Sequence, residues 1–281
     1  MIFQRKSLVA LGLISLVASF NLGCGKKPTA PSAESTSATK TETGAPGAPA
    51  APAAGSGSIK GKVAFTGTAP DMPELNREAD PFCAKTKMKA QDVVVNGNGT
   101  LKNVAITLVG ATGPMPAADV VVKVDQSNCM YEPRIQTGMF GQNIKIINSD
   151  PILHNVHSYS GDKTLFNRAQ PKDSSPVDKT FSKDDGEVIK FKCDVHPWMT
   201  GWLVQSDSPY TAVTNDQGEF EIKGVPAGTY KLQSWQEKFG TKTVDVTVEA
   251  DKPAQANVSY DGTEKASFKY QEIHIGHADM M

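Results

Sequence analysis

Three side chains with metal-binding chemistry lie within seven positions of one another. The stretch "KCDVHPWMTGW" (192–202) contains Cys193, His196 and Met199. A thiolate and a thioether favour soft metals such as Cu(I), and imidazole is a good ligand for both copper states. A copper site for electron transfer needs two histidines and one cysteine in a plane, with a weak axial methionine. The stretch supplies one histidine, so the second must come from elsewhere in the chain.

Two candidates for the second histidine occur about forty residues upstream, in "NSDPILHNVHSYS" (148–160). His154 and His157 are three positions apart, and in a strand such residues point to opposite faces. We therefore expect one of the two histidines to join the cysteine loop. The other would be a structural or surface residue.

The order "HNVH" followed by "C-x-x-H-P-x-M" resembles the cupredoxins, the blue copper proteins of the amicyanin and plastocyanin type. The resemblance covers roughly residues 58–207 and is strongest over 148–203. It implies one copper ion per chain, with ligands from both motifs, and an asparagine that ties the two ligand segments together. The implied ligands are His154, Cys193, His196 and axial Met199, and the implied tie is Asn155. Zinc also accepts two histidines and a cysteine, but the methionine and the resemblance favour copper.

In that family the edge of the second ligand histidine reaches the surface through an apolar patch. The resemblance assigns this edge to His196, with Pro197, Trp198 and Trp202 as the surrounding docking surface for a redox partner. Trp202 would fit a core position equally well. The implied function is an electron carrier rather than an enzyme. The alternatives are copper storage or delivery without electron transfer, and a carbohydrate-binding or adhesion protein.

The start of the chain predicts export. A short positive region at Arg5 and Lys6 precedes the apolar run "SLVALGLISLVASF", which is short for a membrane span. The following "NLGCG" resembles a bacterial lipoprotein signal (1–23), in which Cys24 receives the lipid. The alternative is a plain secretory signal with an incidental cysteine. The residue after Cys24 is glycine rather than a retention-type aspartate, which favours a periplasm-facing lipoprotein of the outer membrane.

Three cysteines remain for the exported protein, Cys83, Cys129 and Cys193. Disulfides persist outside the cytoplasm, and an odd number leaves one thiol to be protected in another way. The simplest division is a Cys83–Cys129 disulfide with Cys193 kept as a metal thiolate. The alternative is that Cys193 pairs with one of the other two and that no metal is bound.

The rest of the chain predicts an all-β protein. Residues 24–57 carry the lipidated cysteine and a tether rich in Ala, Pro, Gly, Ser and Thr that lacks the apolar residues of a core. From residue 58 onward, short alternating runs separated by Gly, Asn and Asp turns are typical of antiparallel sandwiches. We expect a cupredoxin-like Greek-key sandwich over 58–207. Residues 68–142 are longer than such a domain needs and could cover the site or form a partner surface.

A second small β-sandwich is expected over 208–262. Its "TNDQGEF" and "GVPAGTY" turns resemble those of the carboxypeptidase regulatory-like, transthyretin-type domains. Residues 263–281 form a tail that contains further soft ligands, for which a role in copper loading is an alternative to a solvated end: His274, His277, Met280 and Met281. A formal net charge of −1 and the absence of a basic stripe argue against nucleic acid as a partner.

Overall fold

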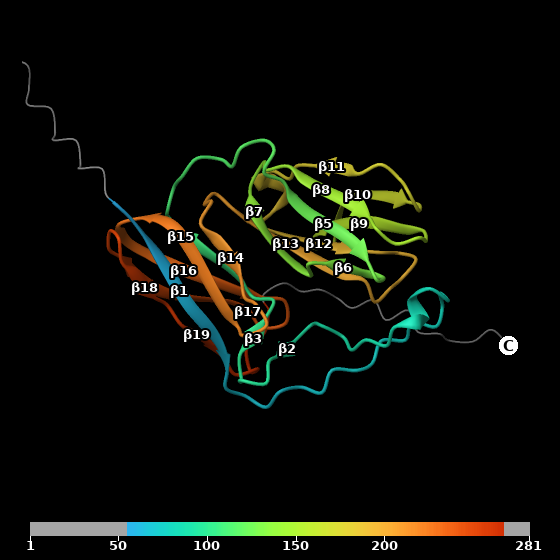
Figure 1. Cartoon of the computed structure of the whole chain (residues 1–281), viewed down its shortest axis with the longest axis horizontal. Coiled ribbons are helices and arrows are strands. Elements are labelled where there is room, and N and C mark those ends of the chain that lie inside the picture. Colours follow the sequence, from blue (N-terminus) through green and yellow to red (C-terminus); the bar gives the residue numbers. More distant parts are fainter. Residues whose placement is uncertain (1–54, 267–281) are drawn as a thin grey trace, which may run out of the picture. The chain divides into compact units, whose positions relative to one another are not determined.

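The computed structural model describes residues 55–266, which fold almost entirely as β-strands (Figure 1). The expected all-β fold class is confirmed for this range, where the helices are the single-turn η1 (Cys83–Lys85) and η2 (Lys183–Asp185). Neither helix in this range is long or apolar enough to cross a membrane. The predicted signal peptide, Cys24, most of the tether and the His/Met-containing end of the tail lie outside the described residues.

One sandwich, formed between residues 122 and 206, contains the residues expected to bind metal. Its first sheet has the order β10-β9-β12-β13-β7, and its second has the order β11-β8-β5-β6. The strands of the first sheet are β7 (Ile135–Met139), β9 (His154–Ser160), β10 (Lys163–Gln170), β12 (Val188–Lys192) and β13 (Thr200–Ser206). Those of the second are β5 (Val122–Ser127), β6 (Met130–Glu132), β8 (Ile144–Asn148) and β11 (Val177–Lys179).

Alternation of apolar and polar residues fixes which face of these strands is buried. In β5, Val122 and Val124 are buried while Lys123 between them is exposed. Side chains that alternate along a strand point to opposite faces, so one face can enter a core. The core between the two sheets includes Ile146 and Phe191, and it also contains Cys193 and Met199.

The second sandwich is built from both ends of the described chain. One sheet has the order β15-β1-β18 with β19 also paired to β1, and the other has the order β14-β4-β16-β17. In Figure 1 the blue β1 accordingly lies among the orange and red strands. A short hairpin, β2–β3, completes the set. The strands are β1 (Ser56–Phe65), β2 (Val94–Val95), β3 (Leu101–Lys102), β4 (Ala105–Val109), β14 (Thr211–Val213), β15 (Glu219–Pro226), β16 (Gly228–Gln236), β17 (Gly240–Val248), β18 (Pro253–Gln255) and β19 (Val258–Tyr260).

This strand pairing corrects the expected domain boundaries. The expected cupredoxin-like range, 58–207, includes β1 and β4, yet both pair with strands of the other sandwich. The chain therefore begins one sandwich, builds the sandwich that contains the expected metal ligands, and then returns at β14 to finish the first. The boundary prediction was wrong because alternation identifies a strand but carries no information about which distant strand it pairs with.

A third cluster of buried residues joins the two sandwiches. Trp202 from β13 packs edge-on against Trp235 from β16, with ring centroids 5.4 Å apart. Arg134 makes a paired contact with Glu237, in which Nε donates to Oε1 at 2.6 Å and Nη2 donates to Oε2 at 2.8 Å. Its Nη1 also donates to the carbonyl of Thr200, at the start of β13. The strand that follows the predicted ligand loop is thus attached to the second sandwich.

Candidate metal centre

Pairing of β9 with β12 brings the two ligand motifs together. The strands are antiparallel, and Lys192 lies opposite His157. The next residue, Cys193, therefore lies beside the beginning of β9, where His154 is found. The loop of residues 193–199, which joins β12 to β13, is closed by two backbone hydrogen bonds. The N–H of Met199 donates to the carbonyl of His196 (2.9 Å), and the N–H of Cys193 donates to the carbonyl of Met199 (3.4 Å).

Three donor atoms converge in the buried space that results. Nδ1 of His154 and Nδ1 of His196 are 2.9 Å apart, and Sγ of Cys193 lies 3.9 Å and 3.7 Å from them. All three side chains are at most 1% exposed. Metal bonds of about 2.0 Å to nitrogen and about 2.3 Å to sulfur, directed about 120° apart, would place sulfur and nitrogen about 3.7 Å from each other. The two sulfur–nitrogen distances therefore fit donors of a single ion. The same geometry would place the two nitrogens about 3.5 Å apart, so the imidazoles would have to separate slightly from their 2.9 Å spacing to hold the ion.

Met199, the expected axial ligand, is fully buried in the same apolar cluster as Cys193. The tight loop places it three residues after His196 and directly before β13. A thioether in an apolar environment provides a weak, soft ligand that suits copper better than zinc. The chemistry of the donor set therefore agrees with the ion that the sequence predicted.

Asp150 orients the ring of His154. Oδ2 of Asp150 lies 2.9 Å from Nε2 of His154, on the side of the ring away from Cys193. An N–H at Nε2 donates to the carboxylate, which leaves the lone pair of Nδ1 for a metal. Burial opposes the charge on Asp150, but hydrogen bonds from His154 and from the N–H groups of Cys129 and Asn128 prevail and lower its pKa. The carboxylate is therefore ionised at neutral pH.

Cys193 is held in a form suited to metal binding. Burial raises the pKa of its thiol, but hydrogen bonds from His154 and from nearby backbone N–H groups outweigh that effect and lower the pKa overall. One of these groups is the N–H of Asn155, 3.5 Å from Sγ. A lowered thiol pKa increases the fraction of thiolate, which is the species that binds metals.

Asn155 connects the two ligand segments through its side chain. Its Oδ1 accepts the N–H of Asp194 at 2.6 Å, and its Nδ2 donates to the carboxylate of Asp194 at 2.8 Å. Asp194 also contacts Nδ1 of His157 at 3.0 Å. Nε2 of His157 lies 3.0 Å from Oγ1 of Thr164. The structure thus places His157 in a polar network beside the loop and outside the group of converging donors.

The expected exposure of the second ligand histidine was wrong. His196 is 1% exposed, and Asp80 and Cys83 from the segment before the sandwich lie against it. Of the expected docking residues, Pro197 is exposed and Trp198 is half-buried, with its ring centroid 5.2 Å from that of His196. Trp202 is buried at the junction between the sandwiches, so it takes the core role that was its alternative.

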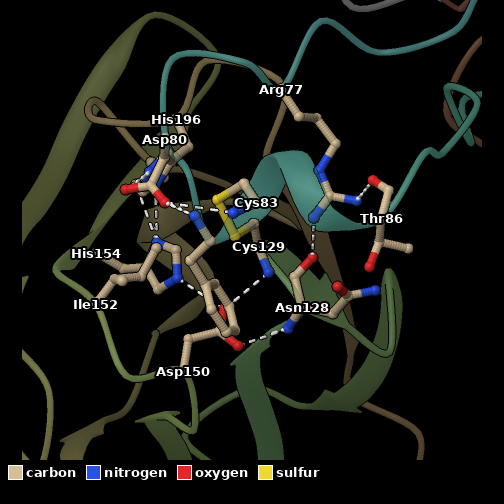
Figure 2. The surroundings of a disulfide bond; sticks show 12 residues. Arg77, Asp80, Cys83, Thr86, Asn128, Cys129, Asp150, Ile152, His154 and His196 are labelled. Carbon is tan, nitrogen blue, oxygen red and sulfur yellow. Dashed lines mark hydrogen bonds and ion pairs between the residues drawn. A yellow bond between two sulfur atoms is a disulfide. The ribbon is translucent and has the colours of Figure 1, made fainter.

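The pairing of the cysteines matches the simplest prediction from their number. Cys83 and Cys129 form a disulfide, and Cys193 is free and buried. The disulfide lies immediately beside His154 and His196 (Figure 2). Sγ of Cys129 groups with Asp150 and His154, while Sγ of Cys83 groups with Asp80 and His196, each set within 4.8 Å.

Sequence reasoning missed three residues around this disulfide: Arg77, Asp80 and Asp150. Arg77 is 3% exposed and donates to the carbonyl of Asn128 at 2.6 Å and to that of Thr86 at 2.9 Å. Each aspartate precedes a proline, in "ADPFC" and "SDPILH", close to a residue that was singled out. An acidic residue within four positions of a predicted ligand or cysteine was the available signal.

Comparisons with known proteins give one family match and several similar solved structures. Residues 202–261 match the family model of the carboxypeptidase regulatory-like domain. No curated protein matches the chain. Similar solved structures include a purple cupredoxin from Nitrosopumilus maritimus, with 22% identity over 30% of this chain and 99% of that one, at a TM-score of 0.27. Amicyanin from Paracoccus versutus has 23% identity over 36% of this chain and 97% of its own, at a TM-score of 0.28.

Proposed function

We propose that this chain is a mononuclear copper protein that carries single electrons. His154, Cys193 and His196 would hold the ion, with Met199 as a weak fourth ligand. The observation that carries the proposal is the convergence of two imidazole nitrogens and one thiolate sulfur in a space closed to solvent. When bound, copper supplies a one-electron couple between Cu(II) and Cu(I).

The way the ligands are held supports electron transfer over copper delivery. His154 is fixed by Asp150, and Cys193 is fixed by the N–H of Asn155 and by the closed loop. Donors held in this way limit the rearrangement that accompanies each electron. The three planar ligands are at most 1% exposed, so release of the ion to an acceptor protein would require the site to open.

We place the docking surface for a redox protein of the cell envelope at Pro197 and Trp198. Pro197 is exposed and directly follows His196, and the ring of Trp198 packs near the imidazole of His196. Small apolar contacts of this kind suit the brief complexes of electron carriers. Trp198→Ala should slow electron exchange with a reduced partner in stopped-flow experiments while leaving the copper spectrum in place.

We also propose that the mature protein is a lipoprotein of the cell envelope, anchored through Cys24 and facing the periplasm at the outer membrane. The support is the signal-like sequence of residues 1–23. Labelling with a radioactive fatty acid in a bacterial host should mark the wild-type protein and leave Cys24→Ala unlabelled. Recovery of Cys24→Ala in the membrane fraction with the label retained would overturn this assignment.

The decisive test of the copper site is a titration of the mature chain with Cu(II), followed by visible absorption. We expect a strong thiolate-to-copper band that saturates at one ion per chain and is lost in Cys193→Ala. His157→Ala is the matched control, because it removes a nearby histidine outside the group of donors, and the band should persist. A wild-type protein that binds Cu(II) without such a band would contradict electron carriage.

A further inference from the structure

Each ligand histidine has a carboxylate behind it. Nε2 of His154 lies 2.9 Å from Oδ2 of Asp150, and Nε2 of His196 lies 3.7 Å from Oδ2 of Asp80. Nε2 of His196 is buried and makes no hydrogen bond within the described part of the chain. Asp80 is the acceptor that faces it. Both carboxylates therefore lie on the sides of the rings opposite the converging Nδ1 atoms.

Each carboxylate is in turn held by the backbone of one half of the disulfide. Asp150 accepts the N–H groups of Asn128 and Cys129, both at 2.7 Å. Asp80 accepts the N–H groups of Phe82 and Cys83, at 2.7 Å and 3.3 Å. Since Cys83 and Cys129 are bonded to each other, the disulfide connects the two loops that hold the carboxylates (Figure 2).

A second contact supports the same connection. Arg77, three residues before Asp80, is buried and donates to the carbonyl of Asn128 beside Cys129. The segment that carries Asp80 is thus attached to the turn between β5 and β6 by one covalent bond and one charged hydrogen bond. In the described chain this segment has no strand pairing with the ligand sandwich, so these attachments fix its place over His196.

We propose that the Cys83–Cys129 disulfide is a clamp that positions Asp80 and Asp150 behind the two ligand histidines and thereby sets the reduction potential of the metal. The inference rests on the proposed copper site. Hydrogen bonding of an imidazole to a carboxylate raises its basicity as a ligand. A more basic, more negative ligand set stabilises Cu(II) over Cu(I), which lowers the potential. Asp80 and Asp150 act as positioning residues through the histidines.

The first test is the reduction potential of the copper-loaded mature chain in Asp80→Asn. The amide oxygen still accepts the N–H groups of Phe82 and Cys83, so the loop keeps these two hydrogen bonds while the negative charge is lost. We expect the potential to rise, with each tenfold loss of preference for Cu(II) equal to about 59 mV. Asp71→Asn is the matched control, since Asp71 is an exposed carboxylate in the same segment and contacts Lys89 instead. Equal potentials in the two variants would overturn the proposal for Asp80.

The second test asks whether the disulfide acts through Asp80. Cys83→Ser/Cys129→Ser should raise the potential in the same direction as Asp80→Asn, and combining the two changes should add little. Coupled residues deviate from additivity, whereas independent ones add. Fully additive shifts, or an unchanged potential in the folded cysteine variant, would overturn the clamp. If the cysteine variant does not fold, Arg77→Met tests the other attachment of the same segment. It should raise the potential in the same direction, and an unchanged potential would overturn the positioning of Asp80 by this segment.

The third test needs no metal. Nitrogen-15 spectra of the histidine rings in the metal-free mature chain should show His154 protonated at Nε2, and Asp150→Asn should lose that preference. A wild-type protein that fails to bind copper would sink the proposed function, and the ring spectra would still decide the positioning role of Asp150. Copper binding with unchanged ring tautomers and potentials in all variants would sink the inference alone.

Discussion

At the scale of single residues, Asn155 does the most to join the two ligand motifs. Its backbone N–H points to the sulfur of Cys193, and its side chain exchanges two hydrogen bonds with Asp194. These contacts cross between β9 and the cysteine loop, which are 38 residues apart in sequence. Loss of the side chain would leave the N–H of Asp194 without its acceptor and would let the loop shift relative to His154.

We therefore predict that Asn155→Ala weakens copper binding by about 10- to 100-fold, as is typical for residues that support metal ligands. The measurement is a competition titration with a chelator of known affinity. Asn167→Ala is the control, because Asn167 donates to the same carboxylate from an exposed position. If both variants bind copper as tightly as the wild type, Asn155 does not hold the ligand segments.

The residues of the candidate metal site could be picked out from the sequence because their chemistry is local. Cys193, His196 and Met199 fall within one loop, and His154 was singled out by the strand period and the family resemblance. Asp80 could not be placed in this way. It lies 116 positions before His196, and it reaches the imidazole through a segment without regular pairing to the sandwich. The excess length of residues 68–142 suggested that this segment could cover the site, but no local pattern assigns Asp80 to the ring of His196.

At the scale of elements, the two ligand strands are joined by a side chain from a third. Tyr131 of β6 is 1% exposed, and its hydroxyl lies 2.8 Å from the carbonyl of Asn155 in β9 and 2.9 Å from that of Lys192 in β12. These carbonyls are next to the positions of His154 and Cys193. Burial, followed by the charges of Cys193 and Asp194, raises the pKa of Tyr131 well above its ordinary value, so the hydroxyl stays protonated and donates.

Tyr131→Phe should lower the free energy of unfolding of the metal-free protein by about 1–3 kcal/mol, because the carbonyls of Asn155 and Lys192 lose the hydroxyl donor that they share. Urea denaturation followed by tryptophan fluorescence gives this quantity. Tyr159→Phe is the control, since the hydroxyl of Tyr159 is half-buried and contacts the side chain of His157 rather than the backbone. A loss in Tyr159→Phe equal to that in Tyr131→Phe would argue against a special role for the buried hydroxyl.

At the scale of the whole molecule, the two sandwiches share a buried ion pair. Arg134 is 3% exposed and contacts Glu237, which is 5% exposed, and Asp92. Burial would lower the pKa of Arg134, but the charge and hydrogen bonds of Glu237 raise it overall, so the guanidinium stays charged. Trp202 also donates from Nε1 to Glu237 at 3.0 Å. The carboxylate of Glu237, which belongs to the second sandwich, therefore contacts two side chains of the first one, Arg134 and Trp202.

Arg134→Met should destabilise the protein by about 3–5 kcal/mol, because it leaves a buried carboxylate without its cation. We expect calorimetry to show the two sandwiches unfolding in separate transitions in this variant. Arg134→Met/Glu237→Met should recover much of the stability, since neither charge is then buried alone. Lys231→Met removes an exposed pair with Asp245 and should cost at most about 1 kcal/mol. A single transition at the wild-type temperature in Arg134→Met would contradict this role.

The interleaved order of the sandwiches could not be predicted for a related reason. Alternating runs indicated many of the strands from residue 58 onward, and the turns near 214–228 identified the C-terminal part of one sandwich. Its partner β1 lies more than 150 residues earlier, and the two strands pair antiparallel within one sheet, a contact that no local sequence pattern encodes. At Gly61 of β1, an added Cβ would lie 1.8 Å from the carbonyl oxygen of Ala256, so this close approach needs glycine. That requirement becomes visible once the pairing is known.

The junction also contains a lysine whose titration should affect the stability of the molecule. Nζ of Lys190 lies 5.0 Å from the ring centroid of Trp202. Burial, and then the nearby charge of Lys192, lower the pKa of Lys190 from 10.5 to about 8. Between these two values the unfolded chain keeps a proton that the folded protein has lost, so this group makes the protein more stable as the pH rises. Below about pH 8 both states are protonated and the full penalty is present.

Lys190→Met should therefore gain most over the wild type at pH 7, and its advantage should shrink as the pH rises from about 8 to 10.5. Urea denaturation of both proteins at several pH values through this range gives the difference in unfolding free energy. Lys163→Met, an exposed position on β10, is the control and should follow the wild-type curve. Parallel curves for Lys190→Met and the wild type would show that the ammonium is as well solvated in the folded protein as in the unfolded chain. In that case the titration of Lys190 would contribute nothing to the pH dependence of the unfolding free energy.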